Sequence, residues 1–317
     1  TIKMSRNVMI KTKELTKKYE DLTAVDNLNL EIYEGEIFGL LGPNGAGKTT
    51  TILMLLGLTE PTSGFATIDG HNTTKEPIYI KRMVGYLPDN VGFYEDMTAR
   101  ENLRFTGRLN GLSEEEIESR IDSLLERVKL SDVGDKRVGT YSKGMKQRLG
   151  IADTLMKDPK VIILDEPTIG LDPAGINEML NLIADLARED KRTVLISSHQ
   201  LYQIQKICDR VGIFVKGHLI AEGPIHTLGE QVFKGKPLTL ELNIEPVDDK
   251  LVSLIKSIRE DIKIKIVDHE QIIIESIDDI RKPLLSLLSD NDYKVLFLKQ
   301  TGRDLDDIYS RYFAREE

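Results

Sequence analysis

One nine-residue segment has the residue types and spacing that suit phosphate binding. It fits the pattern G-x-x-x-x-G-K-[ST] at every fixed position. Its three glycines are expected to adopt positive φ and to bring backbone N–H groups close to phosphate oxygens. The segment consists of Gly42, Pro43, Asn44, Gly45, Ala46, Gly47, Lys48, Thr49 and Thr50.

Lys48 and Thr49 give this segment its chemistry. The lysine is placed to neutralise the β and γ phosphates of a nucleotide, and the threonine hydroxyl is a natural Mg²⁺ ligand. The apolar residues 37–41 predict a buried strand before the loop, and residues 49–58 predict a helix after it, whose positive end faces the phosphates. The segment therefore predicts nucleoside triphosphate binding, and by itself it leaves kinases, GTPases and ATPases open.

Two adjacent carboxylates follow a second apolar stretch. Residues 161–164 predict a buried strand that ends at Asp165 and Glu166, where charge requires a binding partner. Asp165 is positioned to hold Mg²⁺ directly or through water, and Glu166 can deprotonate the water that attacks the γ-phosphate. The alternative is an acidic strand end at the surface, and the presence of Lys48 and Thr49 favours the catalytic interpretation.

Upstream of these carboxylates, residues 141–148 contain a helix start with anion-binding character. Ser142 can cap the helix, and Gly144 leaves its first turn open to an oxyanion. With a phosphate loop before it and an acidic strand end after it, the segment resembles the signature motif of ATP-binding-cassette (ABC) ATPases. Residues from about 8 to 222 are similar to the nucleotide-binding subunit of an ABC transporter.

The resemblance implies functions for three more residues. Tyr19 matches the aromatic residue that stacks on adenine, with packing at a strand edge as the alternative. Asp172 matches a loop that crosses between subunits, and it also fits a helix N-cap before Pro173. His199 matches the switch histidine that contacts the γ-phosphate. The other histidines are expected at the surface or in turns: His71, His218, His226 and His269.

Two departures from the family pattern bear on the site. Asp89 stands where the family usually has glutamine, in the loop that joins the core to the helical insert. Its carboxylate can ligate Mg²⁺ or a water but has a shorter reach, and plain turn formation by residues 88–90 is the alternative. In the signature, Lys143 and Met145 replace the commoner glycine and glutamine, while the two residues expected to touch phosphate remain.

The resemblance implies a head-to-tail dimer, either of two copies or with a homologous cassette. Ser142 and Gly144 of one subunit would complete the nucleotide site of the other, so that two Mg·ATP are sandwiched. Catalysis is expected from Lys48, Glu166 and His199. Removal of the γ-phosphate would loosen the interface and give a two-state element that a partner can sense.

The elements expected to position these residues form an α/β P-loop NTPase core. Residues 8–41 predict short strands of an antiparallel layer beside the nucleotide. Residues from about 95 to 158 predict a helical insert, with capping boxes at 98–101 and 113–116. Apolar strands separated by helices predict a parallel sheet: residues 161–164, 193–197 and 211–215.

A second, smaller domain is expected after the cassette domain of residues 1–225. Residues 226–317 predict a linker and strands and helices in the order β-α-β-β-α-β, which is ferredoxin-like, plus a final helix. Residues 305–308 resemble the acidic-hydrophobic tail motif of some export-type subunits. This domain could bind a regulatory ligand, contribute dimer contacts or simply stabilise the chain.

Composition agrees with a soluble protein of two domains. The chain has 317 residues, of which 40% are hydrophobic and 30% charged. It has neither an apolar stretch of about 18 residues nor the apolar core of a signal peptide. We therefore expect a cytoplasmic protein, held at the inner face of the cell membrane by a permease on a separate chain. The net charge of -9 argues against nucleic acid as a partner, and the single cysteine, Cys208, excludes an internal disulfide.

The sequence thus predicts a Mg²⁺-dependent ATPase, the energy-coupling subunit of an export-type ABC transporter, with ATP and Mg²⁺ as cofactors. The alternative is a soluble ABC ATPase of translation or DNA repair. Such proteins usually carry two cassettes or a long coiled coil, and the sequence has neither a second phosphate loop nor sustained heptads. The ordered set of motifs also disfavours a P-loop kinase or GTPase.

Overall fold

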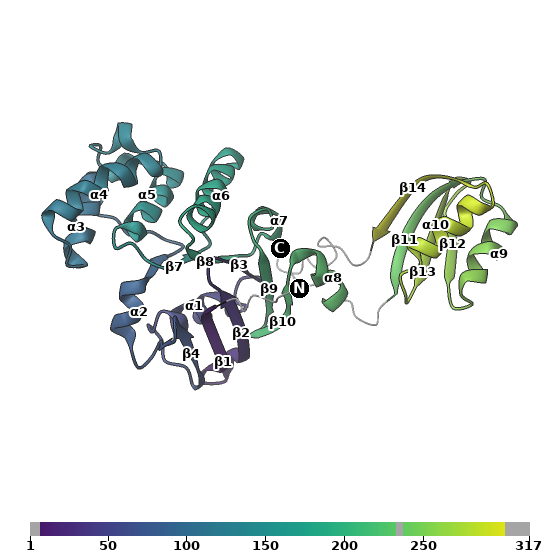
Figure 1. The fold of residues 1–317 in the computed structure, drawn as a ribbon, viewed down its shortest axis with the longest axis horizontal. Coiled ribbons are helices and arrows are strands. Elements are labelled where there is room, and N and C mark those ends of the chain that lie inside the picture. The colour runs from purple at the N-terminus through teal and green to yellow at the C-terminus, as the bar shows by residue number, and fades with distance from the viewer. Residues whose placement is uncertain (1–6, 233–236, 302–317) are drawn as a thin grey trace. The chain divides into compact units, whose positions relative to one another are not determined.

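The computed structural model describes residues 7–232 and 237–301. The chain divides into two compact units, residues 1–225 and 226–317 (Figure 1). Among the residues described, no helix combines the length and the apolar character that crossing a membrane requires.

A six-stranded sheet forms the centre of the first unit, in the order β10-β9-β3-β8-β7-β6. Its neighbours are parallel except for β10, which returns antiparallel beside β9. Every residue of β3, β7 and β8 is buried, as expected for strands covered on both faces. The parallel sheet predicted from the apolar segments is confirmed. The strands are β3 (Ile37–Leu41), β6 (Val84–Leu87), β7 (Val161–Asp165), β8 (Thr193–Ser198), β9 (Arg210–Val215) and β10 (His218–Gly223).

An antiparallel sheet of order β2-β1-β4-β5 forms a second layer, which confirms the predicted antiparallel layer for residues 8–33. The prediction is wrong for residues 37–41, which form β3 of the parallel sheet. Its first two strands, β1 (Val8–Tyr19) and β2 (Leu22–Tyr33), have 12 residues each, longer than the short strands expected. Register shifts along the pair, such as that between Thr12 and Leu15, keep the strands paired where the apolar alternation is interrupted. The sheet is completed by β4 (Ser63–Ile68) and β5 (His71–Asn72).

Helices fill the connections of the first unit. Figure 1 shows three of them grouped into the helical insert, away from β1 and β2. Both predicted capping boxes are present, at Thr98 with Glu101 and at Ser113 with Glu116. The insert helices are α3 (Ala99–Leu109), α4 (Glu114–Arg127) and α5 (Lys143–Leu155), with short 3₁₀ turns at Ser131–Val133 and Val138–Thr140. The others are α1 (Lys48–Leu55), α2 (Pro77–Met83), α6 (Pro173–Arg188) and α7 (Leu201–Ile204). The helix α8 (Ile225–Val232) begins at the last residue of this unit and continues in the second.

The second unit has a four-stranded sheet of order β12-β13-β11-β14, with antiparallel neighbours throughout. Along the chain its elements are β11 (Leu238–Glu245), α9 (Asp249–Ile258), β12 (Lys263–Ile266), β13 (Gln271–Ser276), α10 (Arg281–Asp290) and β14 (Lys294–Thr301). Alternate residues of β11 and β13 join both helices in a separate hydrophobic core. The tail motif of residues 305–308 and the expected final helix lie outside the described residues.

Candidate nucleotide-binding site

The phosphate loop lies where β3 leaves the central sheet and α1 begins. Gly45 and Gly47 have φ of 73° and 104°, conformations that favour glycine. The prediction that all three glycines adopt positive φ is wrong for Gly42, which is absent from that region. Glycine is needed there for a different reason, because a Cβ atom would lie 2.3 Å from the carbonyl oxygen of Phe214 in β9.

The first turn of α1 faces this loop without a side-chain cap. Gly47 is the N-cap residue and offers no side-chain acceptor to the helix N–H groups. Lys48 is only 6% exposed, and its Nζ donates to the carbonyl oxygens of Gly42 at 2.6 Å and Pro43 at 3.1 Å. The loop thus presents helix N–H donors and one ammonium group in the same place, which is the chemistry of an anion site.

The acidic pair closes the other side of the site. Asp165 ends β7, and its Oδ2 accepts a hydrogen bond of 3.0 Å from the Thr49 hydroxyl. Glu166 contacts two partners at once: its Oε1 lies 3.3 Å from Lys48 Nζ, and its Oε2 lies 2.9 Å from His199 Nδ1. Five predicted residues from three parts of the chain therefore form two neighbouring sets of direct contacts, Thr49 with Asp165 and Glu166 with Lys48 and His199.

Burial and like charges set the electrostatics of the acidic pair. Asp165 is 1% exposed, and burial raises the pKa of its carboxyl above the ordinary value, while hydroxyl bonds from Ser197 and Thr49 oppose the rise. Glu166 and Asp89 add like charge that raises this pKa further. Burial, followed by the negative charges of Asp165 and Asp89, raises the pKa of the Tyr86 hydroxyl to about 12. An arrangement with this much negative charge favours a bound cation.

A cavity of about 600 Å³ is lined by Lys48, Thr49, Asp165 and Glu166, whereas His199 is not part of its lining. Its lining includes Tyr19, residues 44–50 and Asp89, so the structure places Asp89 and the proposed adenine-stacking residue beside the phosphate loop. Tyr19 is 45% exposed, and the ammonium of Lys17 lies 4.9 Å from its ring centroid.

Sequence reasoning missed another part of this lining, the turn between β9 and β10. Lys216 and Gly217 both line the cavity, with φ of 48° and 82°. The N–H of Gly217 donates to the carbonyl oxygen of Ala46 at 2.9 Å, which ties the turn to the phosphate loop. The available signal was a lysine–glycine pair directly after an apolar strand, which is a hairpin-turn pattern.

The structure does not bring Ser142, Gly144 and Asp172 to the phosphate loop. They line a separate cavity of about 420 Å³. Ser142 caps α5 by accepting from the N–H of Met145 at 3.3 Å, and Asp172 caps α6 by accepting from the N–H of Gly175 at 3.2 Å. One loop connects the two cavities, because Ile169 lines the first while residues 170–172 line the second.

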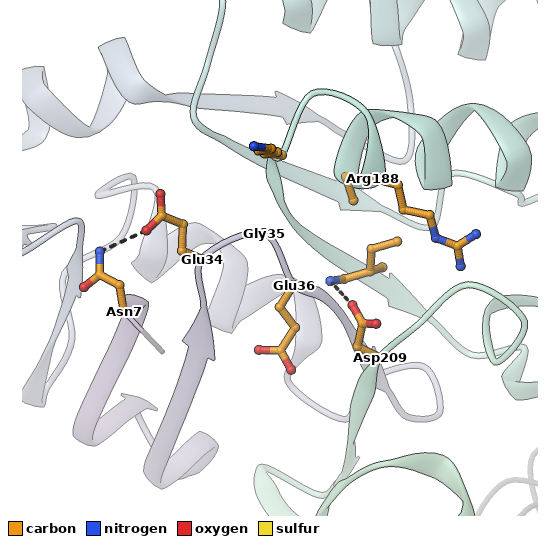
Figure 2. A pocket seen from close by; sticks show the side chains of 9 residues that line it. Asn7, Glu34, Gly35, Glu36, Arg188 and Asp209 are labelled. Carbon is orange, nitrogen blue, oxygen red and sulfur yellow. Dashed lines mark hydrogen bonds between the residues drawn. The ribbon is translucent and has the colours of Figure 1, made fainter. Parts of the chain in front are cut away.

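Another cavity of about 600 Å³ lies at the amino end of β3, opposite the phosphate loop (Figure 2). Its polar groups already serve the fold. Asn7 donates to the Glu34 carboxylate at 3.1 Å, and the N–H of Ile37 donates to the Asp209 carboxylate at 2.9 Å. Glu36, which is 4% exposed, pairs with Arg210 at 3.1 Å. The chemistry of nucleotide binding is concentrated at the other edge of the sheet.

The fold and this site define a P-loop ATPase with a helical insert, and comparison with known proteins agrees. Residues 25–169 match the family model described as ABC transporter. The chain is 48% identical over 222 residues to the bacitracin transport ATP-binding protein of Bacillus licheniformis, covering 70% of this chain and 72% of that protein. It is 33% identical over 314 residues to the linearmycin resistance ATP-binding protein of Bacillus subtilis, covering 94% of this chain and all of that protein.

Solved structures resemble the first unit. A dimeric ATP-binding cassette in a post-hydrolysis state with ADP and phosphate has a TM-score of 0.62 and 29% identity, covering 68% of this chain and 97% of that one. The chain belongs to the ABC transporter family of ATP-binding proteins. It is an ATP-binding subunit of an ABC transporter, and its family hydrolyses ATP. These relatives do not favour the alternative of an ATPase in translation or DNA repair.

Proposed function

We propose that the chain is a Mg²⁺-dependent ATPase that drives a permease encoded on another chain and that does not bind nucleic acid. The cassette of residues 1–225 carries the nucleotide site, and the permease holds the protein at the inner face of the cell membrane. Residues 226–317 comprise a linker and an accessory domain with ferredoxin-like topology. The strand order β12-β13-β11-β14 and the two helices between strands support this topology.

ATP binds along the cavity that Tyr19 and the phosphate loop share. The Tyr19 ring stacks on adenine, because its partly exposed face offers an aromatic platform next to the loop. The N–H groups of residues 44–50 hold the phosphates, and Lys48 exchanges its contact with Glu166 for the β and γ oxygens.

The donor set beside the phosphates fits Mg²⁺. Thr49 and Asp165 present oxygen atoms 3.0 Å apart, and Asp89 adds a carboxylate to the same cavity. Hard divalent cations take oxygen ligands, and Mg²⁺ uses one or two carboxylates together with phosphate oxygens and water. When bound, the ion would be held by Thr49 and Asp165 and would neutralise negative charge on the phosphates.

Glu166 carries the proposal for hydrolysis. Its carboxylate lies within direct contact of both Lys48 and His199, at the end of a buried strand beside the phosphate loop. Glu166 takes a proton from water as the water oxygen forms its bond to the γ-phosphorus and the bond to the ADP oxygen breaks. His199 holds the Glu166 carboxylate through Nδ1, which leaves its other ring nitrogen for the γ-phosphate.

The site is completed by a second subunit. Ser142 and Gly144 lie in a cavity that shares no lining residue with the phosphate-loop cavity, so within one subunit they face a different space. In a head-to-tail dimer, Ser142 and Gly144 of each subunit meet the γ-phosphate held by the other, with the Asp172 loop at the crossing. Both subunits then contact the γ-phosphate. Its hydrolysis removes these contacts and weakens the dimer interface, and the permease responds to this change.

The variant Glu166→Gln tests this function. It keeps the size of the side chain and one acceptor oxygen but removes the base, so phosphate release should fall about 100-fold or more. ATP binding should persist, and light scattering should show a larger dimer fraction with ATP. Glu118→Gln is a matched control, because its surface ion pair with Arg104 lies outside both the cavity of the phosphate loop and the cavity of Ser142 and Gly144. Turnover near that of the wild type in Glu166→Gln would exclude the assignment.

A further inference from the structure

Ser197 is a buried hydroxyl that contacts both acidic residues of the nucleotide site. It lies on β8, directly opposite Asp165 in the parallel pairing with β7, and it is 0% exposed. Its Oγ donates a short hydrogen bond to Asp165 Oδ1. The same oxygen accepts from the N–H of Glu166 at 3.0 Å. A single hydroxyl therefore links the side chain of one residue to the backbone of the next.

The first contact fixes the direction of the Asp165 carboxylate. Ser197 donates to Oδ1 from β8, and Thr49 donates to Oδ2 from α1 at 3.0 Å. With one donor on each oxygen, rotation of the carboxylate about its last side-chain bond would break both hydrogen bonds. Asp165 is therefore held in one orientation at the edge of the cavity, and the two donors come from different elements of the core.

The second contact concerns the backbone of Glu166. This residue has φ of 49°, in the left-handed region that residues with a Cβ rarely occupy. Such a conformation persists only where surrounding contacts hold it. The N–H of Glu166 is held by Ser197 Oγ at 3.0 Å, with the Ser197 carbonyl oxygen at 3.2 Å. This backbone turn points the Glu166 side chain to Lys48 and His199.

We infer that Ser197 is a positioning residue for ATP hydrolysis, setting the orientation of Asp165 and the backbone turn of Glu166 together through its hydroxyl. The inference rests on the proposed function of these two acidic residues. Ser197 touches neither nucleotide nor water in this account and acts through its two neighbours. The result of losing the hydroxyl is a site that still binds ATP but aligns its metal-holding and base groups poorly.

Three variants test this inference in the full-length chain. Ser197→Ala should lower kcat for ATP about 10- to 100-fold and raise the Mg²⁺ concentration for half-maximal rate, while KM for ATP changes less than about threefold. Ser197→Thr retains the hydroxyl and should recover most of kcat. Thr193→Ala is the matched control, since it removes another fully buried hydroxyl from the far end of β8, where it accepts from the Gly35 N–H at 3.0 Å. It should behave like the wild type.

A binding measurement gives a second readout that does not depend on turnover. Mg²⁺ should enhance the affinity of Ser197→Ala for a fluorescent ATP analogue less than it enhances the affinity of the wild type, while affinity without Mg²⁺ stays the same. If Ser197→Ala keeps wild-type kcat and Mg²⁺ dependence while Glu166→Gln is inactive, the inference is wrong and the proposed function stands. Equal losses in Ser197→Ala, Ser197→Thr and Thr193→Ala would assign the serine to folding alone and also overturn the inference.

Discussion

At the scale of single residues, one carboxylate, that of Glu166, contacts two other residues of the site. Glu166 engages Lys48 through one carboxylate oxygen and His199 through the other, so both neighbours depend on its position. On the proposed function, Lys48 exchanges this contact for phosphate when ATP binds. In this proposal the Lys48 ammonium pairs with the Glu166 carboxylate before ATP binds and with phosphate oxygens after it binds. The buried ammonium therefore has a negatively charged partner both without and with nucleotide.

Tyr19 offers a test of nucleotide binding that leaves the catalytic residues intact. Tyr19→Ala removes the aromatic platform, and base stacking on an aromatic side chain contributes about 1–3 kcal/mol. KM for ATP should rise about 5- to 100-fold with little change in kcat. Tyr19→Phe keeps the ring and should resemble the wild type. Steady-state kinetics of both variants decide the matter, and an unchanged KM in Tyr19→Ala would place adenine elsewhere.

Residue spacing could indicate the phosphate loop and the acidic pair because both stand directly at the ends of apolar strands. The segments at 42–50 and 165–166 are recognisable because charged residues and glycine directly follow apolar strands. Spacing could not show that Glu166 contacts Lys48, since that depends on how β7 lies beside the phosphate loop. Ser197 was missed because a serine in an apolar strand gives no signal until its partner on the neighbouring strand is known.

At the scale of elements, α5 presents two glycines with opposite surroundings. A Cβ at Gly150 would lie 2.4 Å from Leu87 Cδ1, because the helix packs closely on the end of β6. A Cβ at Gly144 would meet only Leu171 Cδ2, at 3.7 Å, which is an ordinary contact. Packing within the chain thus explains why residue 150 is glycine, but it does not explain why residue 144 is glycine.

The pair Gly144→Ala and Gly150→Ala separates folding from dimer formation. Gly150→Ala should lower the free energy of unfolding in urea by about 1–3 kcal/mol through overpacking. Gly144→Ala should leave unfolding unchanged but lower turnover at least about tenfold, because its methyl group occupies the space of the γ-phosphate held by the partner. If Gly144→Ala turned over ATP normally, this helix start would not face a nucleotide.

Asp153, in the same helix, makes stability depend on pH. Burial raises the pKa of its carboxyl to about 6, although a hydrogen bond from Thr106 and the charge of Lys157 oppose the rise, and Oδ1 has no hydrogen-bond partner among the described residues. Since the folded pKa exceeds the unfolded one, the folded state binds the proton more tightly, and stability is lost as pH rises from about 4 to 6.

Asp153→Asn should therefore match the wild type near pH 4 and be more stable at pH 7 by roughly 1–3 kcal/mol. Urea unfolding of the full chain at several pH values measures the difference. Asp158→Asn is the control, because that carboxylate is largely exposed and pairs with Arg192. Parallel stability curves for the wild type and Asp153→Asn would show that the carboxyl is not held in its neutral form.

Elements with strong periodicity were predicted, and those that depend on tertiary pairing were not. The insert helices follow from capping boxes and apolar spacing, which are local. The two-residue strand β5 and the short helix α2 carry no such signal, and β10 exists because the turn at Lys216 returns the chain beside β9. The length of β1 and β2 depends on bulges that apolar alternation does not reveal.

At the scale of the whole molecule, a hydrophobic cluster of the cassette and a hydrophobic cluster of the second unit have no residue in common. Each unit therefore has its own source of stability. The cassette holds every catalytic residue proposed here, but it holds Ser142 and Gly144 in a different cavity from the phosphate loop. The active molecule on this proposal is a dimer, and neither subunit has a complete site alone.

Mixing two inactive variants tests that conclusion directly. Lys48→Ala damages the phosphate loop, and Ser142→Arg blocks the signature cavity, so each variant alone should show little turnover. In a mixed head-to-tail dimer, one site combines the intact loop of the Ser142→Arg subunit with the intact signature of the Lys48→Ala subunit. Phosphate release should therefore reappear on mixing and peak at equal proportions.

The double variant Lys48→Ala/Ser142→Arg supplies the control for this experiment. Mixed with Lys48→Ala it offers no intact loop, so no pairing restores a site, and turnover should stay at background. A site completed within one subunit gives the opposite pattern, because mixing single variants then leaves every site defective. Phosphate release in the first mixture together with background release in the second is expected only when the phosphate loop and the signature residues of one site come from different subunits.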